Sequence, residues 1–279
     1  MKQPLARSFA LSAFVTLALS LPAAPCRAAN PLPDKNLEAA VRAVLHEEKA
    51  ELTDEKLRNV YVLEADKKGI KDLTGLDKCK NLALLKLTGN QVADLKQLKE
   101  LTNLQSLDLA GNKIEDITPL AGLTKLQYLE LSNNQVAKLD ALKGLTSLSA
   151  LYLSGNKISD LAPLGTLTRL SSLSLARNQV KDLAVLTKVT KVSTLDLNEN
   201  QIADLAPLAK QTELSLLMLE KNKITDLTPL VTAAKADAEG PKRFAPYLRL
   251  YLKDNPLSDD AKTKQLAALK GYGVRLEPQ

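Results

Sequence analysis

Few residues in this sequence could support catalysis, metal binding or nucleic-acid binding. Its 279 residues include one histidine, two cysteines, no tryptophan, three phenylalanines and six tyrosines. The single histidine, His46, lacks the partner residues that a catalytic or metal site requires, and there is no glycine-rich phosphate loop. The shortage of aromatic residues also argues against a nucleic-acid-binding surface. We therefore predict a protein that is not an enzyme and that has no metal or cofactor.

Residues 1–29 have the features of a secretory signal peptide. Lys2 and Arg7 precede an apolar stretch over residues 9–22, and small residues around Ala28 fit a cleavage site. The apolar stretch is shorter than a membrane-spanning helix requires. We expect a cleaved signal peptide and a secreted or periplasmic mature protein without an integral membrane segment. An uncleaved membrane anchor is the less favoured alternative.

The strongest pattern in the sequence is a set of seven asparagines, each 22 residues after the one before it. An eighth follows after a longer interval. A fixed period of this length predicts a solenoid, in which successive repeats stack on one another. An asparagine amide both donates and accepts hydrogen bonds, so stacked asparagines can satisfy backbone groups that a sheet leaves unpaired. We predict this structural role, rather than ligand binding or glycosylation. The members of this asparagine ladder are Asn90, Asn112, Asn134, Asn156, Asn178, Asn200, Asn222 and Asn255.

Each repeat also carries a strand pattern. In one unit, Leu107 and Leu109 alternate with a period of two, which predicts a short strand with both leucines on one side. The unit Leu104-Gln-Ser-Leu107-Asp-Leu109-Ala-Gly-Asn112-Lys-Ile114 resembles the leucine-rich repeat, L-x-x-L-x-L-x-x-N-x-[IV].

The repeat length and the Asp-[LI]-x-Pro-Leu segment that follows the asparagine most resemble the internalins and the leucine-rich regulator of protein phosphatase-1. This resemblance covers about residues 60–257. It implies an α/β solenoid, a curved array with a parallel β-sheet on the concave face. Short helical or turn segments would lie on the convex face, with helical caps at both ends.

Loss of the signal peptide would change both the charge and the cysteine content. It would remove three basic residues and no acidic ones, so the formal net charge of +6 would fall to +3. It would also remove Cys26. Lipid attachment to this cysteine would require a small residue directly before it, and Pro25 stands there instead, so a lipid anchor is less favoured. Cys79 would then be the only cysteine, which excludes an intramolecular disulfide. Because other repeats hold leucine or valine there, we expect Cys79 to be buried.

The sequence outside the regular repeats predicts two caps. Residues 30–59 form the N-terminal cap, with one helix that Asp34 caps and a second that Thr53 caps and that runs to Asn59. The apolar face of the first helix should comprise Leu37, Ala40, Val41, Val44 and Leu45. About nine repeats follow over residues 60–257, of which the first is degenerate. Residues 258–279 form the C-terminal cap.

One insertion interrupts the array. Asn222 and Asn255 are 33 residues apart rather than 22, so about 11 residues are inserted near 231–241. Residues 232–238 favour a helix, which Gly240 should end. Insertions in repeat proteins often lie at binding faces, but a tolerated insertion fits the sequence equally well.

An acidic residue follows most of the asparagines by four positions. Calcium binding is one interpretation, but one aspartate per repeat supplies few of the 6–8 oxygen ligands that calcium requires. Local hydrogen bonding to the turn backbone is the favoured interpretation. Lys138 interrupts this acidic column. Its members are Asp94, Asp116, Asp160, Asp182, Asp204, Asp226 and Asp259.

The concave face is the candidate binding surface. Its side chains stand six, four and two positions before each asparagine, and nine strands about 4.8 Å apart would span roughly 40 Å. Six acidic and three basic residues point from it, so a basic or mixed-charge protein fits it better than DNA does. Its tyrosines and apolar residues are candidate anchors for a binding partner. The alternative is that they only cover the sheet and bind nothing. The candidate protein-binding residues are Asp108, Tyr128, Glu130, Tyr152, Asp196, Leu216, Met218, Arg249 and Tyr251.

We therefore predict an exported, non-catalytic module, expected to be monomeric, that binds a protein on its concave face. A glycan is a second ligand class, and nucleic acid is not expected. The resemblance to the internalins implies protein binding. No surface anchor or immunoglobulin-like domain follows the repeats, so we do not expect host adhesion. The resemblance to the phosphatase regulator supports the alternative of a regulator or inhibitor of an enzyme, although a signal peptide argues against a cytosolic phosphatase partner.

Overall fold

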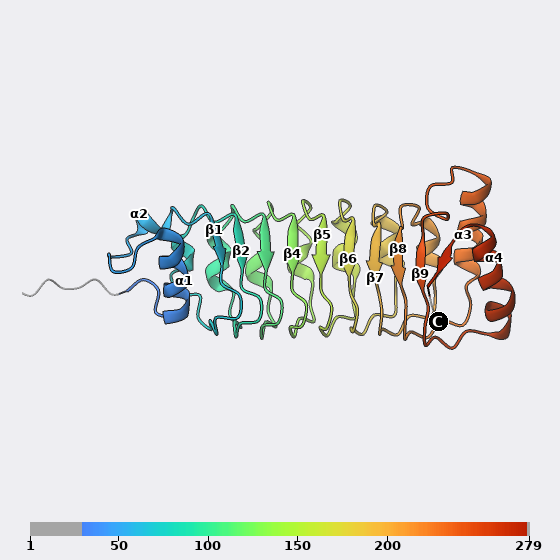
Figure 1. Ribbon diagram of the computed structural model, residues 1–279, viewed down its shortest axis with the longest axis horizontal. Helices are drawn as coiled ribbons and strands as arrows, with labels where there is room; N and C mark the ends of the chain where they lie inside the picture. Colours follow the sequence, from blue (N-terminus) through green and yellow to red (C-terminus); the bar gives the residue numbers. More distant parts are fainter. Residues whose placement is uncertain (1–29, 278–279) are drawn as a thin grey trace, which may run out of the picture.

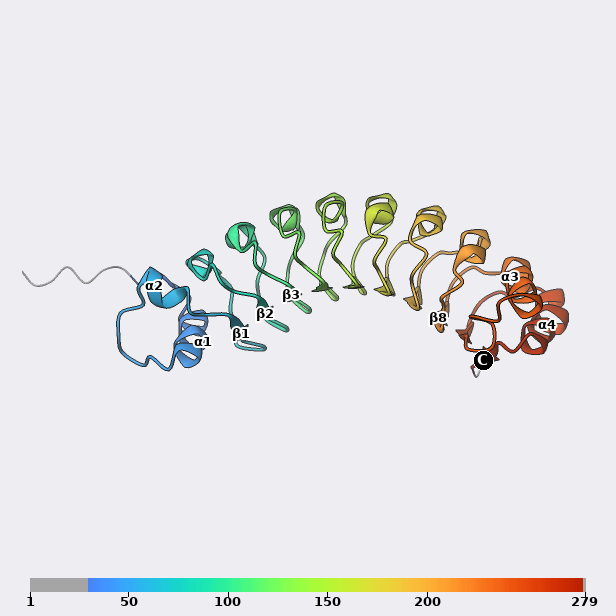
Figure 2. The ribbon, with the colours of Figure 1, turned by 90° about the horizontal axis from the view of Figure 1, so that it is seen from above.

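A computed structural model of the chain describes residues 30–277. The predicted signal peptide, residues 1–29, lies outside these described residues. Ten short strands of the described chain lie side by side in chain order and form one parallel sheet (Figure 1). Seen from above, the chain forms an arc, with the sheet along the inside and short helical segments along the outside (Figure 2). This arrangement is the curved α/β solenoid that the sequence predicts.

The strands follow the period of the repeat. Up to β8, each pairs with the next in parallel register at an offset of 22 residues, so that Tyr128 lies between Ser106 and Ala150. The strands are β1 Val62–Glu64, β2 Leu84–Lys86, β3 Ser106–Asp108, β4 Tyr128–Glu130, β5 Ala150–Tyr152, β6 Ser172–Ser174, β7 Thr194–Asp196, β8 Leu216–Met218, β9 Arg249–Tyr251 and β10 Arg275–Leu276.

Single turns of 3-10 helix return the chain along the convex side. A helical turn is wider than the spacing of about 4.8 Å between neighbouring strands. The helical side of each repeat therefore takes more room along the array than the strand side, and the array bends toward the sheet. These turns are η1 Leu76–Lys78, η2 Lys96–Glu100, η3 Thr118–Leu120, η4 Asp140–Leu142, η5 Ala162–Thr166, η6 Ala184–Lys188 and η7 Ala206–Lys210.

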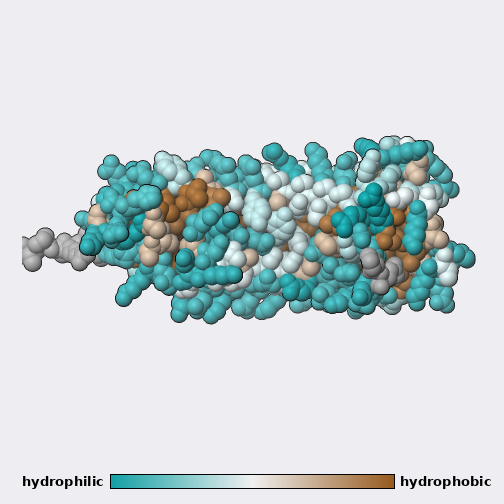
Figure 3. Space-filling model, in the orientation of Figure 1, coloured by the Kyte–Doolittle hydropathy of each residue, from teal (hydrophilic) through white to brown (hydrophobic). Residues whose placement is uncertain are grey.

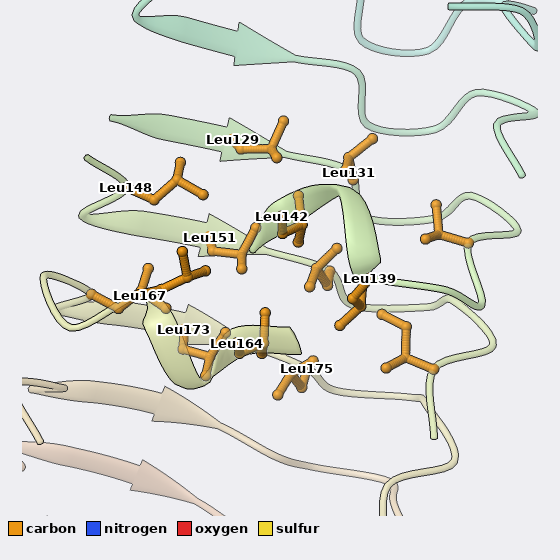
Figure 4. Packing of buried hydrophobic residues seen from close by; sticks show 14 of the residues in the cluster. Leu129, Leu131, Leu139, Leu142, Leu148, Leu151, Leu164, Leu167, Leu173 and Leu175 are labelled. Carbon is orange, nitrogen blue, oxygen red and sulfur yellow. The ribbon is translucent and has the colours of Figure 1, made fainter. Parts of the chain in front are cut away.

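The core lies between the sheet and the 3-10 turns. Leu129 and Leu151 point inward from β4 and β5, toward Leu142 and Leu164 on the convex side (Figure 4). All four are fully buried. Cys79, which lies in an earlier repeat, is also buried, as the sequence predicts. The centre of each three-residue strand is therefore buried while its flanking residues face the concave surface. This burial pattern is the one that the period-two leucines predict.

The asparagine ladder joins each turn to the turn before it. Asn156 donates from Nδ2 to the carbonyl oxygens of Leu131 at 3.0 Å and Leu153 at 2.9 Å, and its Oδ1 accepts from the Val136 N–H. Asn90, at the other end of the regular array, makes the same three kinds of bond. Each amide thus connects two successive repeats through backbone groups that the sheet does not pair.

The acidic column hydrogen-bonds to the local backbone. Asp116 accepts from the Thr118 N–H at 2.8 Å, and five other members of the column accept in the same way from the N–H two residues further on. No such bond is found for Asp259 among the described residues, and Asp259 itself already lies within the helical segment that follows Ser258. Within residues 30–277, no group of three or more histidine, cysteine or acidic residues is placed to hold a metal ion.

Two helices precede the first strand, α1 Lys35–Leu45 and α2 Asp54–Leu57. Asp34 caps α1 by accepting from the N–H groups of Asn36 and Leu37, and its second oxygen accepts from Lys71 and Asp72 in the first repeat. One carboxylate therefore starts the helix and also attaches it to the array.

The N-terminal helices depart from their predicted limits in two details. The helix that Thr53 caps ends at Leu57, two residues before the predicted Asn59, because one turn already buries its single core leucine. Val44 is 37% exposed, so its predicted inward position is wrong. The helix buries only the narrow stripe of Leu37 and Val41 against the sheet edge.

The insertion forms a third helix, α3 Thr228–Glu239, which starts four residues before the predicted helix. Pro229 occupies its first turn, where a missing N–H costs nothing. Leu230, Ala234 and Asp237 are buried, and α3 packs against η7 and the final helix, α4 Leu266–Gly271.

A π-helical turn, Ala261–Gln265, leads into α4, and its first N–H is capped by the Ser258 hydroxyl at 3.1 Å. Every helix among residues 30–277 is too short or too polar to span a bilayer.

Candidate functional site

The concave face is open along the whole sheet and is the surface turned toward the viewer in Figure 3. Its residues alternate with buried ones, as in β4, where Tyr128 and Glu130 flank the buried Leu129. Hydrophobic surface gathers near both ends of this face, and the middle is less hydrophobic. The candidate residues from the sequence fall into two groups, with Asp196 between them.

The first group, which we call the central patch, consists of Asp108, Tyr128, Glu130 and Tyr152 on β3, β4 and β5. Tyr152 is aligned with Glu130, so the tyrosines are diagonal neighbours. Their ring centroids are 5.6 Å apart and their planes are tilted by 48°. This separation and tilt lie within the range of favourable aromatic pairs, so the two rings support each other.

The central patch combines these rings with two carboxylates. Asp108 and Glu130 are aligned on neighbouring strands. Burial raises the pKa of Glu130, and the charge of Asp108 adds to this effect, whereas hydrogen bonds from Ser132 oppose it. Burial also raises the pKa of Tyr128 to about 12, with contributions from the charges of Glu130 and Asp108. Negative potential therefore concentrates around the tyrosine pair.

The second group, the C-terminal patch, consists of Leu216, Met218, Arg249 and Tyr251 on β8 and β9. Leu216 is aligned with Arg249, and Met218 with Tyr251. Arg249 donates from Nε to Glu277 at 2.8 Å and from Nη2 to the Tyr251 hydroxyl at 2.7 Å. Its guanidinium carbon also lies 5.8 Å from the Tyr251 ring centroid. Glu277 thus already neutralises the cation of this patch.

Asp196 lies on β7, outside both patches. Its Oδ2 accepts from the Ser174 hydroxyl at 3.1 Å, and its Oδ1 accepts from the Asn198 N–H at 3.1 Å. The Ser174 hydroxyl also hydrogen-bonds to that of Ser154. These partners satisfy the Asp196 carboxylate within the sheet surface.

A third group of exposed residues was missed among the sequence-based candidates. Tyr61 is 55% exposed and Val62 is 47% exposed at the N-terminal end of the sheet, where Val62 is aligned with Leu84. The signal was available, because Val62 and Leu84 are successive apolar residues in one outward row. They extend the apolar surface of the concave face to its first strand.

The convex side carries a hollow of about 610 Å³ between η3 and η4. Lys138 lines it where neighbouring repeats have aspartate, and Ala141 lines it where Pro119 and Pro163 stand in the adjoining repeats. The hollow is lined by both acidic and basic side chains, among them Asp116, Asp140 and Lys138.

Comparison with known proteins supports the architecture. The family model for leucine-rich repeats (2 copies) matches residues 102–144 and 146–188. Internalin C2 from Listeria monocytogenes is 35% identical and superimposes with a TM-score of 0.70, covering 72% of this chain and 89% of that chain. None of the curated proteins matches the sequence.

Two more distant structures show the fold alone. The functional domain of InlJ from Listeria monocytogenes is 24% identical, with a TM-score of 0.64 over 87% of this chain and 54% of that chain. A leucine-rich-repeat protein from Leptospira interrogans is 23% identical, with a TM-score of 0.62 over 73% of this chain and 56% of that chain. This chain therefore spans about half the length of each of these two proteins.

Proposed function

Because the chain belongs to the internalin-like family of leucine-rich-repeat proteins, we propose that it is an exported, non-catalytic module that binds a protein partner on its concave face. The observation that carries this proposal is the tyrosine pair of the central patch, Tyr128 and Tyr152, held on adjacent strands at the middle of the arc. Tyrosine is among the residues that contribute most to protein interfaces.

Small neighbours leave the tyrosines accessible to a partner. Ser106 and Ala150 flank Tyr128 along its row, and Ser174 follows Tyr152. A ring fixed by a strand and by a second ring loses little conformational freedom on binding, so contact with it contributes a larger net free energy. Leu216 and Met218 supply a second apolar contact toward the C-terminal end of the same face.

Export is supported by the signal-like sequence of residues 1–29, and the mature protein is then secreted or periplasmic. Mass spectrometry of the N-terminus of the protein from its native cells tests this step. A mature chain that begins near Asn30 is expected. A cytosolic chain that retains Met1 would contradict export and favour the alternative function, regulation of an enzyme.

Site-specific photo-crosslinking tests the binding face directly. A photoreactive residue replaces Ala150, which is aligned with Tyr128 and stands two residues before Tyr152, and in a matched variant it replaces Ala121, which is exposed on the convex side after η3. In cell envelopes, we expect a covalent protein adduct from position 150 and none from position 121. An adduct from position 121 alone, or equal adducts from both, would place the binding surface elsewhere.

The same experiment separates the ligand classes. A protein adduct that protease removes supports a protein partner, whereas an adduct that resists protease and is shortened by glycosidases would indicate a glycan. An adduct with an enzyme whose turnover changes on binding would favour the regulator alternative.

A further inference from the structure

The two carboxylates of the central patch have no cationic partner in the fold. Asp108 and Glu130 are aligned on adjacent strands, where like charges destabilise the pair. Lys86 is the next residue in the same row, but its Nζ lies 3.5 Å from Glu64 on the other side. Among residues 30–277, no basic nitrogen lies within 4.0 Å of Asp108 or Glu130.

Other acidic residues on this face and its edges have different surroundings. Glu64 pairs with Lys86, Glu277 pairs with Arg249, and Asp196 accepts two hydrogen bonds from the sheet surface. Asp66, which accepts from the Thr88 N–H, and Glu220 also form no ion pair among residues 30–277, but neither belongs to an aligned pair of carboxylates beside the two tyrosines. In the central patch, one oxygen of each carboxylate accepts a backbone N–H, from Ala110 or Ser132, within its own strand end. These bonds leave both carboxylates without a neutralising charge, so the pair can still attract a cation from outside the chain.

The tyrosine pair lies against these carboxylates. Tyr128 is on the same strand as Glu130, and Tyr152 is aligned with Glu130 on the next strand. A planar cation that stacks on an aromatic ring and pairs with carboxylates gains both kinds of stabilisation, and arginine is the side chain that combines them. Calcium fits less well, because two carboxylates supply too few of its oxygen ligands.

We propose that the central patch receives a positively charged side chain of the protein partner, an arginine, whose guanidinium lies against Tyr128 and Tyr152 and pairs with Asp108 and Glu130. This inference rests on the proposed function, because it names the chemistry of the partner at the same face. The charge of the whole concave face, with six acidic and three basic residues, complements such a basic segment.

The test uses the mature protein and two short probe peptides that are identical except for one arginine or citrulline. Citrulline has nearly the same shape but no charge. Tyrosine ring signals are followed by ¹H–¹³C NMR during titration at low ionic strength. We expect the arginine peptide to shift the Tyr128 and Tyr152 signals, and the citrulline peptide to bind about fivefold or more weakly.

Matched variants locate the effect. Glu130→Gln should reduce binding of the arginine peptide to the level of the citrulline peptide. Asp196→Asn removes a charge from the same face, and its effect should stay within about twofold because Asp196 already has partners. Asp108→Asn provides a second variant if Glu130→Gln changes the far-UV circular dichroism. Equal binding of the two peptides, an equal effect of Asp196→Asn, or the same shifts on adding calcium alone would overturn the proposal.

This outcome is independent of the proposed function, because the probe peptides require no natural partner. Arginine-selective shifts without a crosslink from position 150 would contradict the proposed function and leave the cation site intact. Conversely, a crosslink from position 150 that Glu130→Gln leaves unchanged, together with equal peptide binding, would contradict the cation site and leave the binding face intact.

Discussion

Each asparagine of the ladder works as a connector between backbones. The Asn156 amide is buried, and it satisfies two carbonyl oxygens and one N–H that belong to two successive repeats. A carboxylate could supply only the acceptor and a lysine ammonium only donors, whereas the asparagine amide supplies two N–H donors and an oxygen acceptor. The recurrence of asparagine at this position therefore follows from the geometry of the turn.

Asn156→Ala should lower the free energy of unfolding by roughly 1–3 kcal/mol, because it leaves buried backbone groups without partners. Urea unfolding followed by circular dichroism measures this change. The matched control is Asn103→Ala, which removes two exposed side-chain bonds, to the Lys80 carbonyl and from the Lys125 ammonium, and should change stability by about 0.5 kcal/mol or less. Equal effects of the two substitutions would show that the ladder is not a main source of stability.

Cys79 illustrates the core at the scale of one residue. Burial raises the pKa of its thiol to about 12, and the charge of Asp77 contributes to the shift. The thiolate is the reactive form, so the native protein should resist iodoacetamide at pH 8 and react only after denaturation. Mass spectrometry detects the adduct. Modification of the native protein at the rate of a free thiol would mean that this part of the core opens readily.

Among the elements, α3 is attached to the array by a buried carboxylate. Asp237 accepts hydrogen bonds from the backbone N–H groups of Arg243, Phe244 and Ala245. Burial opposes its ionisation, but these donors outweigh burial and hold the pKa of Asp237 below its ordinary value of 3.8. The inserted residues therefore have a definite packing role beside η7 and α4, whether or not they also contact a partner.

This carboxylate makes the C-terminal end of the array sensitive to acid. A lowered pKa in the folded state means that the stabilisation is fully present above pH 3.8 and is lost as the pH falls through the lower folded value. Asp237→Asn should remove this stabilisation at neutral pH and speed amide hydrogen exchange in α3 and β9. Glu239→Gln, on the exposed end of the same helix, is the control. Unchanged exchange in Asp237→Asn would refute this role.

The regular elements were predictable because one period controls them. Leucines two residues apart before each asparagine defined the strands, the buried face and the outward rows. The ends were harder, because their limits depend on contacts that leave no period. Helical spacing places Val44 on the apolar face of its helix, yet Val44 has no repeat to pack against. The start of α3 at Thr228 follows from Pro229, which fits a first helical turn.

The candidate site was predictable in position but not in chemistry. The outward rows identified Tyr128 and Tyr152, while their ring geometry depends on side-chain rotamers that the sequence does not specify. Likewise, the sequence could not show that Lys86 turns to Glu64 and leaves Asp108 and Glu130 without a cation. Pairing choices among neighbouring charges are decided by distances of a few ångströms.

At the scale of the whole molecule, the arc separates two kinds of surface. The concave sheet carries more acidic than basic residues, although the chain without residues 1–29 has a formal net charge of +3. Most of the positive charge therefore lies on the outer sides of the array. We expect this separation to orient an approaching basic partner toward the concave face, with an association rate that falls as salt increases.

The most direct test of a binding site at the central patch is the affinity of the crosslinked partner for Tyr128→Ala/Tyr152→Ala, measured by isothermal titration calorimetry. The control is Tyr247→Ala, which removes a tyrosine that is 63% exposed but lies outside the concave strands. With folding unchanged by circular dichroism, the double variant should bind more weakly by more than about 1 kcal/mol, and the control should match the wild type. Equal affinity of the double variant and the wild type would contradict a binding site at the central patch.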